Sequence, residues 1–257
     1  MFEVLFETVQ DGEELYLAWL FSGLAWTVAL ALAGWCVAFV LGVLVGCGRT
    51  SSNRAIALAA RLYVEVFRNI PIIVQMFLWY FVLPELLSAD LGSAMKKMVP
   101  PWGAFFPALI ALSLYTGARV AEQVKAGIEA LPYGQRSAAR ALGMTELGVY
   151  RTILLPQALR IIMPTLTSEV MGIFKNTSVA LTIGLLELTA QARQINEFTF
   201  KTFQAFGAAT ILYLLLALSV YAVMHGLEKR LRTPGTEPVI AKRRFLFFPM
   251  RKEAAKP

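Results

Sequence analysis

Five long apolar segments divide the chain, and polar or charged stretches separate them. The first contains 34 residues without a charged side chain, about 51 Å as a helix at ~1.5 Å per residue, against ~30 Å for the hydrocarbon core of a bilayer. Each of the others is long enough to cross a bilayer as one helix. The pattern predicts an all-α polytopic membrane protein with five transmembrane helices, over residues 15–48, 62–87, 98–118, 161–186 and 202–227.

The composition supports a membrane protein and argues against several other classes. Hydrophobic residues make up 57% of the 257 residues and charged residues 16%, against roughly 25% charged in a typical soluble domain. A soluble globular chain and a disordered chain are both disfavoured. The only cysteines, Cys36 and Cys47, lie in one apolar span and do not make a disulfide scaffold. Segment 1–14 is acidic and lacks the basic start of a cleaved signal peptide, so we expect a periplasmic N-terminal segment.

The distribution of Lys and Arg between the spans predicts the orientation in the membrane. Connections 49–61 and 125–160 and the tail after His225 carry 17 of these residues, whereas the other connections carry 4. Basic residues accumulate on the cytoplasmic side. The N-terminus is therefore predicted in the periplasm and the C-terminus in the cytoplasm. We expect the basic tail, residues 233–257, to adhere to anionic membrane lipids and not to bind nucleic acid.

The cytoplasmic loop, about 122–156, is longer than a simple connection needs. Pro132 and Gly134 are expected to break the helix that leaves the third span, and Ser137 to begin a short helix across the cytoplasmic face. Gly143 is expected to end this helix in a left-handed conformation. The loop therefore presents a short helix to the cytoplasm.

This short helix has a pattern that favours docking to another protein. Its small residues Ala138, Ala139 and Ala141 are predicted to form one face that enters a cleft in a partner, with Arg136 and Arg140 available for carboxylates of that partner. A helix resting on lipid headgroups is the alternative, but such helices use Trp, Phe or Leu anchors that this face lacks.

The loop resembles the coupling loop of the permease subunits of ABC importers. That family has the pattern E-A-A, three residues, G, nine residues, I-x-L-P, and this chain matches its spacing with one departure, Ser137 in place of the glutamate. The departure puts a carboxylate contact to the ATPase in doubt. By this resemblance the ATPase-coupling residues are Ser137, Ala138, Ala139, Arg140, Gly143, Ile153, Leu155 and Pro156.

Further motifs are similar to the polar amino-acid subfamily, which includes histidine, arginine, glutamine and glutamate permeases. They are Tyr63 to Pro71 followed by Gln75, Gly134-Gln135, and Lys175 to Ser178. Segments 116–124, 167–169 and 182–192 most resemble glutamate/aspartate import permeases. The resemblance spans residues 15–232.

The resemblance implies a type I ABC-importer permease in the bacterial inner membrane. It implies a second, different permease subunit, two cytoplasmic ATPase subunits and a periplasmic amino-acid-binding protein as partners, with glutamate or aspartate as substrate. The alternatives are a permease for glutamine, histidine or arginine, and an ion-coupled secondary transporter. The sequence holds no G-x-x-x-x-G-K-[ST] run and no H-E-x-x-H or G-x-S-x-G arrangement. We therefore expect no catalytic residues, metal or cofactor in this chain, with ATP and Mg²⁺ bound by the partner ATPase.

Charged residues at membrane depth need a partner or a task, because burying them is costly. Glu65 and Arg68 lie on one helical face and are predicted to pair with each other or with the coupling loop. Pro71 lies just beyond them and is expected to bend this region, as a gating helix requires. We interpret these three residues as structural or gating residues.

Four residues are candidates for the substrate path: Arg119, Glu169, Lys175 and Asn176. Arg119 is predicted either to contact an acidic substrate, since a guanidinium binds carboxylates in a bidentate manner, or to pair with Glu122 on its own helix. Glu169 is expected to find its partner on the second permease subunit. Lys175 is predicted to support Asn176 and span packing more than to bind an acidic side chain.

Overall fold

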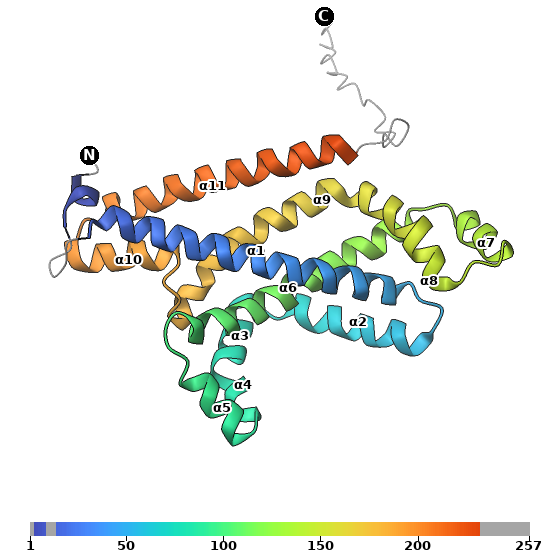
Figure 1. Ribbon diagram of the computed structural model, residues 1–257, viewed down its shortest axis with the longest axis horizontal. Helices are drawn as coiled ribbons and strands as arrows, with labels where there is room; N and C mark the ends of the chain where they lie inside the picture. The colour runs from blue at the N-terminus through green and yellow to red at the C-terminus, as the bar shows by residue number, and fades with distance from the viewer. Residues whose placement is uncertain (1–2, 9–13, 232–257) are drawn as a thin grey trace, which may run out of the picture.

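A computed structural model describes residues 3–8 and 14–231 of the chain. These residues are helical and form no sheet (Figure 1). The α-helices are α1 (Tyr16–Arg49), α2 (Arg54–Asn69), α3 (Ile72–Phe77), α4 (Leu83–Leu86), α5 (Ala89–Lys96), α6 (Trp102–Glu129), α7 (Tyr133–Ala141), α8 (Glu146–Val149), α9 (Leu155–Asn176), α10 (Leu188–Thr199) and α11 (Thr202–Leu231). Two 3-10 helices, η1 (Glu3–Phe6) and η4 (Thr177–Ile183), and two π-helical turns, η2 (Leu78–Val82) and η3 (Tyr150–Leu154), complete the set.

Helix α1 runs along most of the long axis of the molecule and packs against α6 (Figure 1). Gly42 and Gly46 of α1 face Val120 and Val124 of α6, and a Cβ atom added at Gly46 would stand 2.6 Å from the Cβ of Val124. Close approach of small residues is how helices associate in lipid, where water does not drive apolar contacts. The glycines of α1 thus form a close contact with α6, which we call the glycine seam, while its exposed apolar side chains are suited to contact lipid.

The structure revises two of the five predicted spans. Three described helices are long and apolar enough to cross a membrane: α1, α6 and α11. The second predicted span, 62–87, is not one helix, because α2 and the α3–α4 segment meet at 103° and form at most one broken span. The fourth, 161–186, is shifted: α9 begins earlier, at Leu155, ends at Asn176, and does not pass as a span by length and composition.

The break after α2 has a local physical cause. Pro71 has no N–H to continue the helix and restricts Ile70, whose backbone is extended. The buried Gln75 amide then donates to two carbonyl oxygens at the end of α2, those of Phe67 at 2.8 Å and Ile70 at 2.9 Å. The predicted bend at Pro71 is therefore confirmed, and Gln75 satisfies the backbone that it leaves open.

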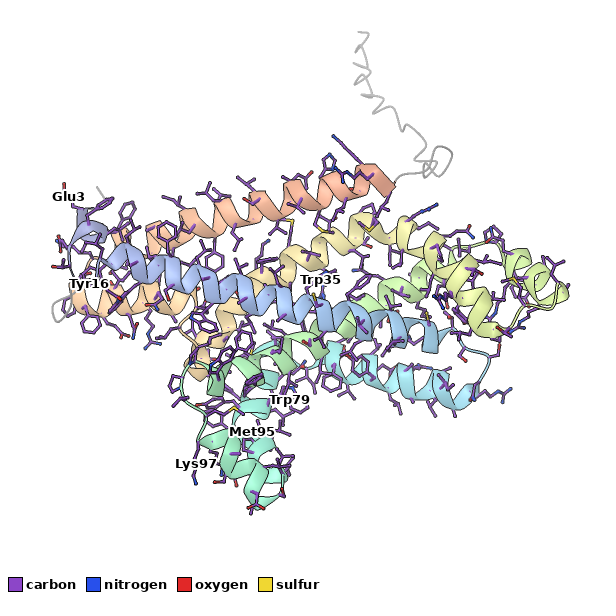
Figure 2. The ribbon with its side chains drawn as sticks, in the orientation of Figure 1. Glu3, Tyr16, Trp35, Trp79, Met95 and Lys97 are labelled. Carbon is purple, nitrogen blue, oxygen red and sulfur yellow. The ribbon has the colours of Figure 1, made fainter. Side chains whose placement is uncertain are left out.

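Beyond this break, α3, α4 and α5 form an arm that projects from the body of α1 and α6. Figure 2 shows Trp79, Met95 and Lys97 on this arm and Trp35 on α1 in the body. Trp79 stacks on Phe67 of α2 at 6.4 Å between ring centroids. Pro84 and Pro156 each lie two residues after a π-helical turn. Proline has no N–H to donate to the helix, and the wider turn accommodates it.

Candidate functional site

An ion pair between α6 and α9 lies in the body of the molecule. The Nε of Arg119 donates to Oε2 of Glu169 at 2.7 Å, and Nη2 donates to Oε1 at 3.0 Å. Gln123, one turn further along α6, donates to the same Oε1 at 2.8 Å. The glutamate side chain is 8% exposed and the arginine side chain 45%. A bidentate pair thus holds the two helices together while one side of the guanidinium stays open.

This geometry corrects two sequence expectations. Arg119 does not pair with Glu122, and Glu169 finds its partner within this chain instead of on a second permease subunit. Arg119 and Glu169 are 50 residues apart on different helices, so no local spacing pointed to the pair. The arginine is still placed with an accessible face, as a substrate contact requires.

Glu122, in the C-terminal half of α6, instead contacts two arginines. It pairs with Arg49 at the end of α1 and lies 3.5 Å from a guanidinium nitrogen of Arg68 on α2. Glu65 pairs with Arg61 at 2.7 Å, so the expected Glu65–Arg68 pair is not formed. Arg68 does reach the start of the coupling loop, the second of its two predicted partners. Three helices are therefore tied together at this end.

One face of α9 and the following η4 is uncovered and carries several polar side chains beside the apolar Ile161. Its exposed side chains include Thr165, Ser168, Lys175 and Thr182, which recur at helical spacing. Within the described part of the chain, the Lys175 ammonium has no ion pair or hydrogen bond, so it does not support the half-buried Asn176 as expected. The exposed face of α11 is different, since leucines dominate it.

The coupling loop forms a helix, but with other limits and another face than predicted. Helix α7 begins at Tyr133, directly after Pro132, four residues before Ser137. Gly143 has φ of 80°, which confirms the left-handed end.

The alanines of α7 do not share one face, which corrects the sequence expectation. Ala139 is buried in the core, while Ala138 and Ala141 are exposed. Ile153 and Leu155 pack against the same core cluster, and the exposed Pro156 lies in the first turn of α9. Only part of the coupling-loop motif, residues 137–156, is therefore accessible to a partner.

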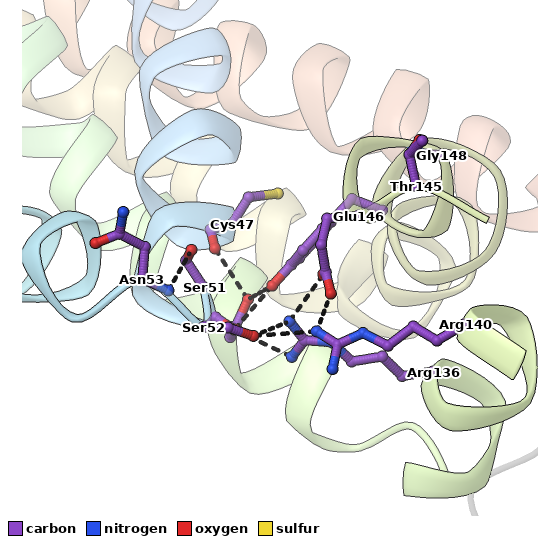
Figure 3. A network of polar contacts seen from close by, with 11 residues as sticks. Cys47, Ser51, Ser52, Asn53, Arg136, Arg140, Thr145, Glu146 and Gly148 are labelled. Atoms are coloured by element: carbon purple, nitrogen blue, oxygen red, sulfur yellow. Dashed lines mark hydrogen bonds and ion pairs between the residues drawn. The ribbon is translucent and has the colours of Figure 1, made fainter. Parts of the chain in front are cut away.

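Arg136 and Arg140 of α7 both have partners within the chain. Both contact Glu146, at 3.1 Å from Arg136, and both donate to the Ser52 hydroxyl oxygen at 3.1 Å (Figure 3). The sequence did not predict these internal contacts. The two arginines join α7 to the turn between α1 and α2.

The surface of α7 and its neighbours includes large apolar side chains among polar ones. Tyr133, Leu142 and Leu147 are 86%, 84% and 77% exposed. Single exposed apolar residues are common, and the feature here is that three occur within one short, mostly polar loop. The sequence analysis missed them, although large apolar side chains within a polar loop were the available signal.

A buried carboxylate at the other end of the molecule was also missed. Glu187 is fully buried at the start of α10 and accepts hydrogen bonds from the backbone of Thr189 and Ala190 at 3.0 and 2.9 Å. The Tyr213 hydroxyl of α11 donates to it at 2.7 Å. Burial raises the pKa of Glu187 above its ordinary value. Glu187 therefore caps α10 and fixes it to α11.

A comparison with protein families decides what these features belong to. The profile of the "Binding-protein-dependent transport system inner membrane component" family matches residues 38–233. The chain belongs to this family. It is a multi-pass membrane protein and the permease subunit of an ABC importer. The alternative of an ion-coupled secondary transporter is thereby set aside.

Curated relatives and solved structures agree with the family assignment. The permease is 43% identical to the glutamate/aspartate import permease protein GltJ of Escherichia coli, over 87% of this chain and 92% of that protein. It is 33% identical to the histidine/lysine/arginine/ornithine transport system permease protein HisM of Salmonella typhimurium, over 82% and 88%.

The crystal structure of an amino acid ABC transporter with histidines is 31% identical and matches with a TM-score of 0.70, over 84% of this chain and 95% of that one. The inward-facing MetNI methionine transporter, 18% identical with a TM-score of 0.67, shares the fold. The permease therefore has the type I ABC permease fold that the coupling-loop motif implied.

Proposed function

We propose that this permease imports acidic amino acids, glutamate and aspartate, and forms half of the translocation path. The observation that carries the proposal is Arg119, a partly open guanidinium at the α6–α9 contact of a chain 43% identical to a glutamate/aspartate permease. A guanidinium stays charged and binds carboxylates through paired hydrogen bonds. Glu169 orients the Arg119 guanidinium, and the open side of the guanidinium contacts the side-chain carboxylate of the substrate.

The polar face of α9 supports a path next to this pair. A charged side chain that faced lipid would be costly. Lys175 and the exposed hydroxyls of α9 therefore face the path or the second permease subunit. Asn176, at the end of α9, belongs to the same path in this proposal.

The proposed topology keeps five spans, with the N-terminus in the periplasm. The spans are α1, the bent α2–α4 segment, α6, α9 with η4, and α11, within a transmembrane domain of residues 15–232. Helix α9 fits because Arg119 neutralises its glutamate inside the chain. The α1–α2 turn, which Arg49 and Arg54 flank, lies at the same end as α7 and α8, and the N-terminus lies at the opposite end with α10 (Figure 1). Of segment 1–14, residues 1–2 and 9–13 lie outside the described residues, as does the whole of 233–257.

The proposed partners are a different permease subunit, two cytoplasmic ATPase subunits and a periplasmic amino-acid-binding protein. Tyr133, Leu142 and Leu147 supply the apolar contact to the ATPase, and Ser137 supplies no carboxylate. ATP and Mg²⁺ bind in the ATPase. A permease for histidine or another polar amino acid is the second candidate, since a relative named for histidine, lysine, arginine and ornithine transport matches over a similar length.

The test is ATP-driven uptake of labelled glutamate, aspartate, glutamine and histidine by the full complex in proteoliposomes. The variants are Arg119→Gln, the double variant Arg119→Gln with Glu169→Gln, and Arg193→Gln as a control from an exposed pair. We expect both Arg119 variants to lose uptake of the acidic pair and the control to retain it. The double variant leaves no buried charge unpaired, so its recovery of glutamate uptake would show that Arg119 only balances Glu169. No acidic uptake by the unmutated complex would overturn the substrate assignment.

A further inference from the structure

Two arginines of α7 donate hydrogen bonds to the turn that joins α1 to α2. Arg136 donates through Nη1 to the carbonyl oxygen of Thr50 at 3.2 Å and through Nη2 to the Ser52 hydroxyl at 3.1 Å. Arg140 donates to the same Ser52 hydroxyl at 3.1 Å (Figure 3). The two arginines lie four residues apart, so they project from the same side of α7. Helix α7 is thus bonded directly to the end of α1.

The segment after α7 also forms hydrogen bonds with this turn. The Tyr150 hydroxyl, in the π-helical turn η3, donates to the Thr50 carbonyl oxygen at 2.8 Å and lies 2.9 Å from the Thr50 hydroxyl. The guanidinium of Arg136 lies 5.4 Å above the Tyr150 ring, and Glu146 bridges both arginines. Arg136 therefore contacts Tyr150 directly and is linked to Arg140 through Glu146.

Polar contacts dominate the attachment of α7 because its apolar contacts are few. Ala139 is the single buried residue among the nine of α7. The remaining tie is a reciprocal amide pair between Gln135 and Gln157 of α9, at 3.0 and 3.3 Å. The Arg136 side chain is 22% exposed, which shields its charged hydrogen bonds from water. Arg136 also places a positive charge at the C-terminal end of the 34-residue helix α1, which is the negative end of the helix dipole.

We propose that Arg136 is the positioning residue through which movement of α7 reaches α1 and α2, with Thr50 and Ser52 as the receiving end. This inference rests on the proposed function and deepens it, since it names the route from the ATPase contact to the membrane helices. Movement of α7 is passed to the turn because each end is held by several directed bonds. From the turn it acts on α1 and on α2, whose C-terminal end carries the 103° break.

The test measures coupling in the complete complex of permease pair, ATPase and binding protein, reconstituted in proteoliposomes. Variants are Arg136→Gln, Ser52→Ala and their combination. Arg54→Gln is the matched control, because Arg54 lies two residues from Ser52 and its side chain has no partner within the described residues. The readouts are copurification of the ATPase, basal ATP hydrolysis, and its stimulation by substrate-loaded binding protein.

We expect Arg136→Gln to retain the ATPase and basal hydrolysis but to lose stimulation by at least about fivefold, the lower range of measured couplings between sites. The combination should lose little more than Arg136→Gln alone, because both changes break one link. Additive losses, or a stimulation equal to that of Arg54→Gln, would overturn the inference. Loss of ATPase copurification would show that Arg136 serves docking instead. The stimulation ratio does not depend on which amino acid is carried, so a wrong substrate assignment would appear only in the unmutated uptake panel.

Discussion

Arg119 and Glu169 share one bidentate ion pair but differ widely in exposure, 45% for the arginine side chain and 8% for the glutamate. Removing one partner therefore has unequal consequences. Without Arg119 the buried carboxylate keeps, among the described residues, only its bond from Gln123, whereas without Glu169 the guanidinium is still partly open to solvent.

We expect Arg119→Gln to destabilise the permease more than Glu169→Gln. An unpaired buried charge costs up to ~3–5 kcal/mol, and the half-open site here reduces that figure. Thermal unfolding of the purified complex in nanodiscs checks the order, with Arg61→Gln, from the exposed Arg61–Glu65 pair, as the control. Equal losses for the two variants would contradict the unequal exposure as the cause.

The glycine seam between α1 and α6 predicts a stability effect without a charge. Gly46→Val would place side-chain atoms against Val124, where even a Cβ would stand too close, and overpacking of this kind costs about 1–3 kcal/mol. Gly226→Ala on α11 is the control, because no atom lies within 4 Å of a Cβ added there. We expect a lower unfolding temperature and poorer membrane yield for Gly46→Val alone. An unchanged unfolding temperature would show that the two helices separate readily.

Gln75 predicts the stability of the bend after α2. Gln75→Met keeps the size of this buried side chain but removes two hydrogen bonds. A buried carbonyl left unpaired costs about 1–3 kcal/mol, and the partly buried carbonyls of Phe67 and Ile70 should cost less. We expect lower stability and faster proteolysis of the connection between α2 and α3 in limited digestion. Gln204→Met is the comparison for the loss of a glutamine in general. Gln204 is partly buried and its side chain accepts a hydrogen bond from the Val4 backbone N–H. Digestion at the same rate in both variants would mean that Pro71 alone fixes the bend.

Local patterns predicted the features of this fold that depend on neighbouring residues. Pro71 marked the bend and Gly143 the left-handed helix end, because each acts through its own backbone. Partners from different helices were not predictable: Glu169 for Arg119, Glu122 for Arg49, and Ser52 for Arg136 are 50, 73 and 84 residues away. The packing of helices fixes these partners, and no spacing within one helix encodes it.

The exposed leucines of the coupling loop make a last prediction, about assembly. Leu142 and Leu147 are 84% and 77% exposed beside α7, whereas the two arginines once expected to bind a partner are engaged within the chain. An apolar anchor truncated at a protein interface typically costs more than ~1 kcal/mol, and a buried carboxylate costs more. Leu142→Asp and Leu147→Asp should therefore weaken ATPase binding by about tenfold or more.

The control for these variants is Phe200→Asn, at the opposite end of the molecule. Phe200 is 86% exposed and has φ of 54°, a left-handed conformation that asparagine tolerates. We expect this variant to bind the ATPase normally in a titration of the purified permease pair in nanodiscs, and all three variants to unfold at the parental temperature. Normal ATPase binding by both leucine variants would place the contact elsewhere on the loop, on the exposed Ser137, Ala138 and Ala141.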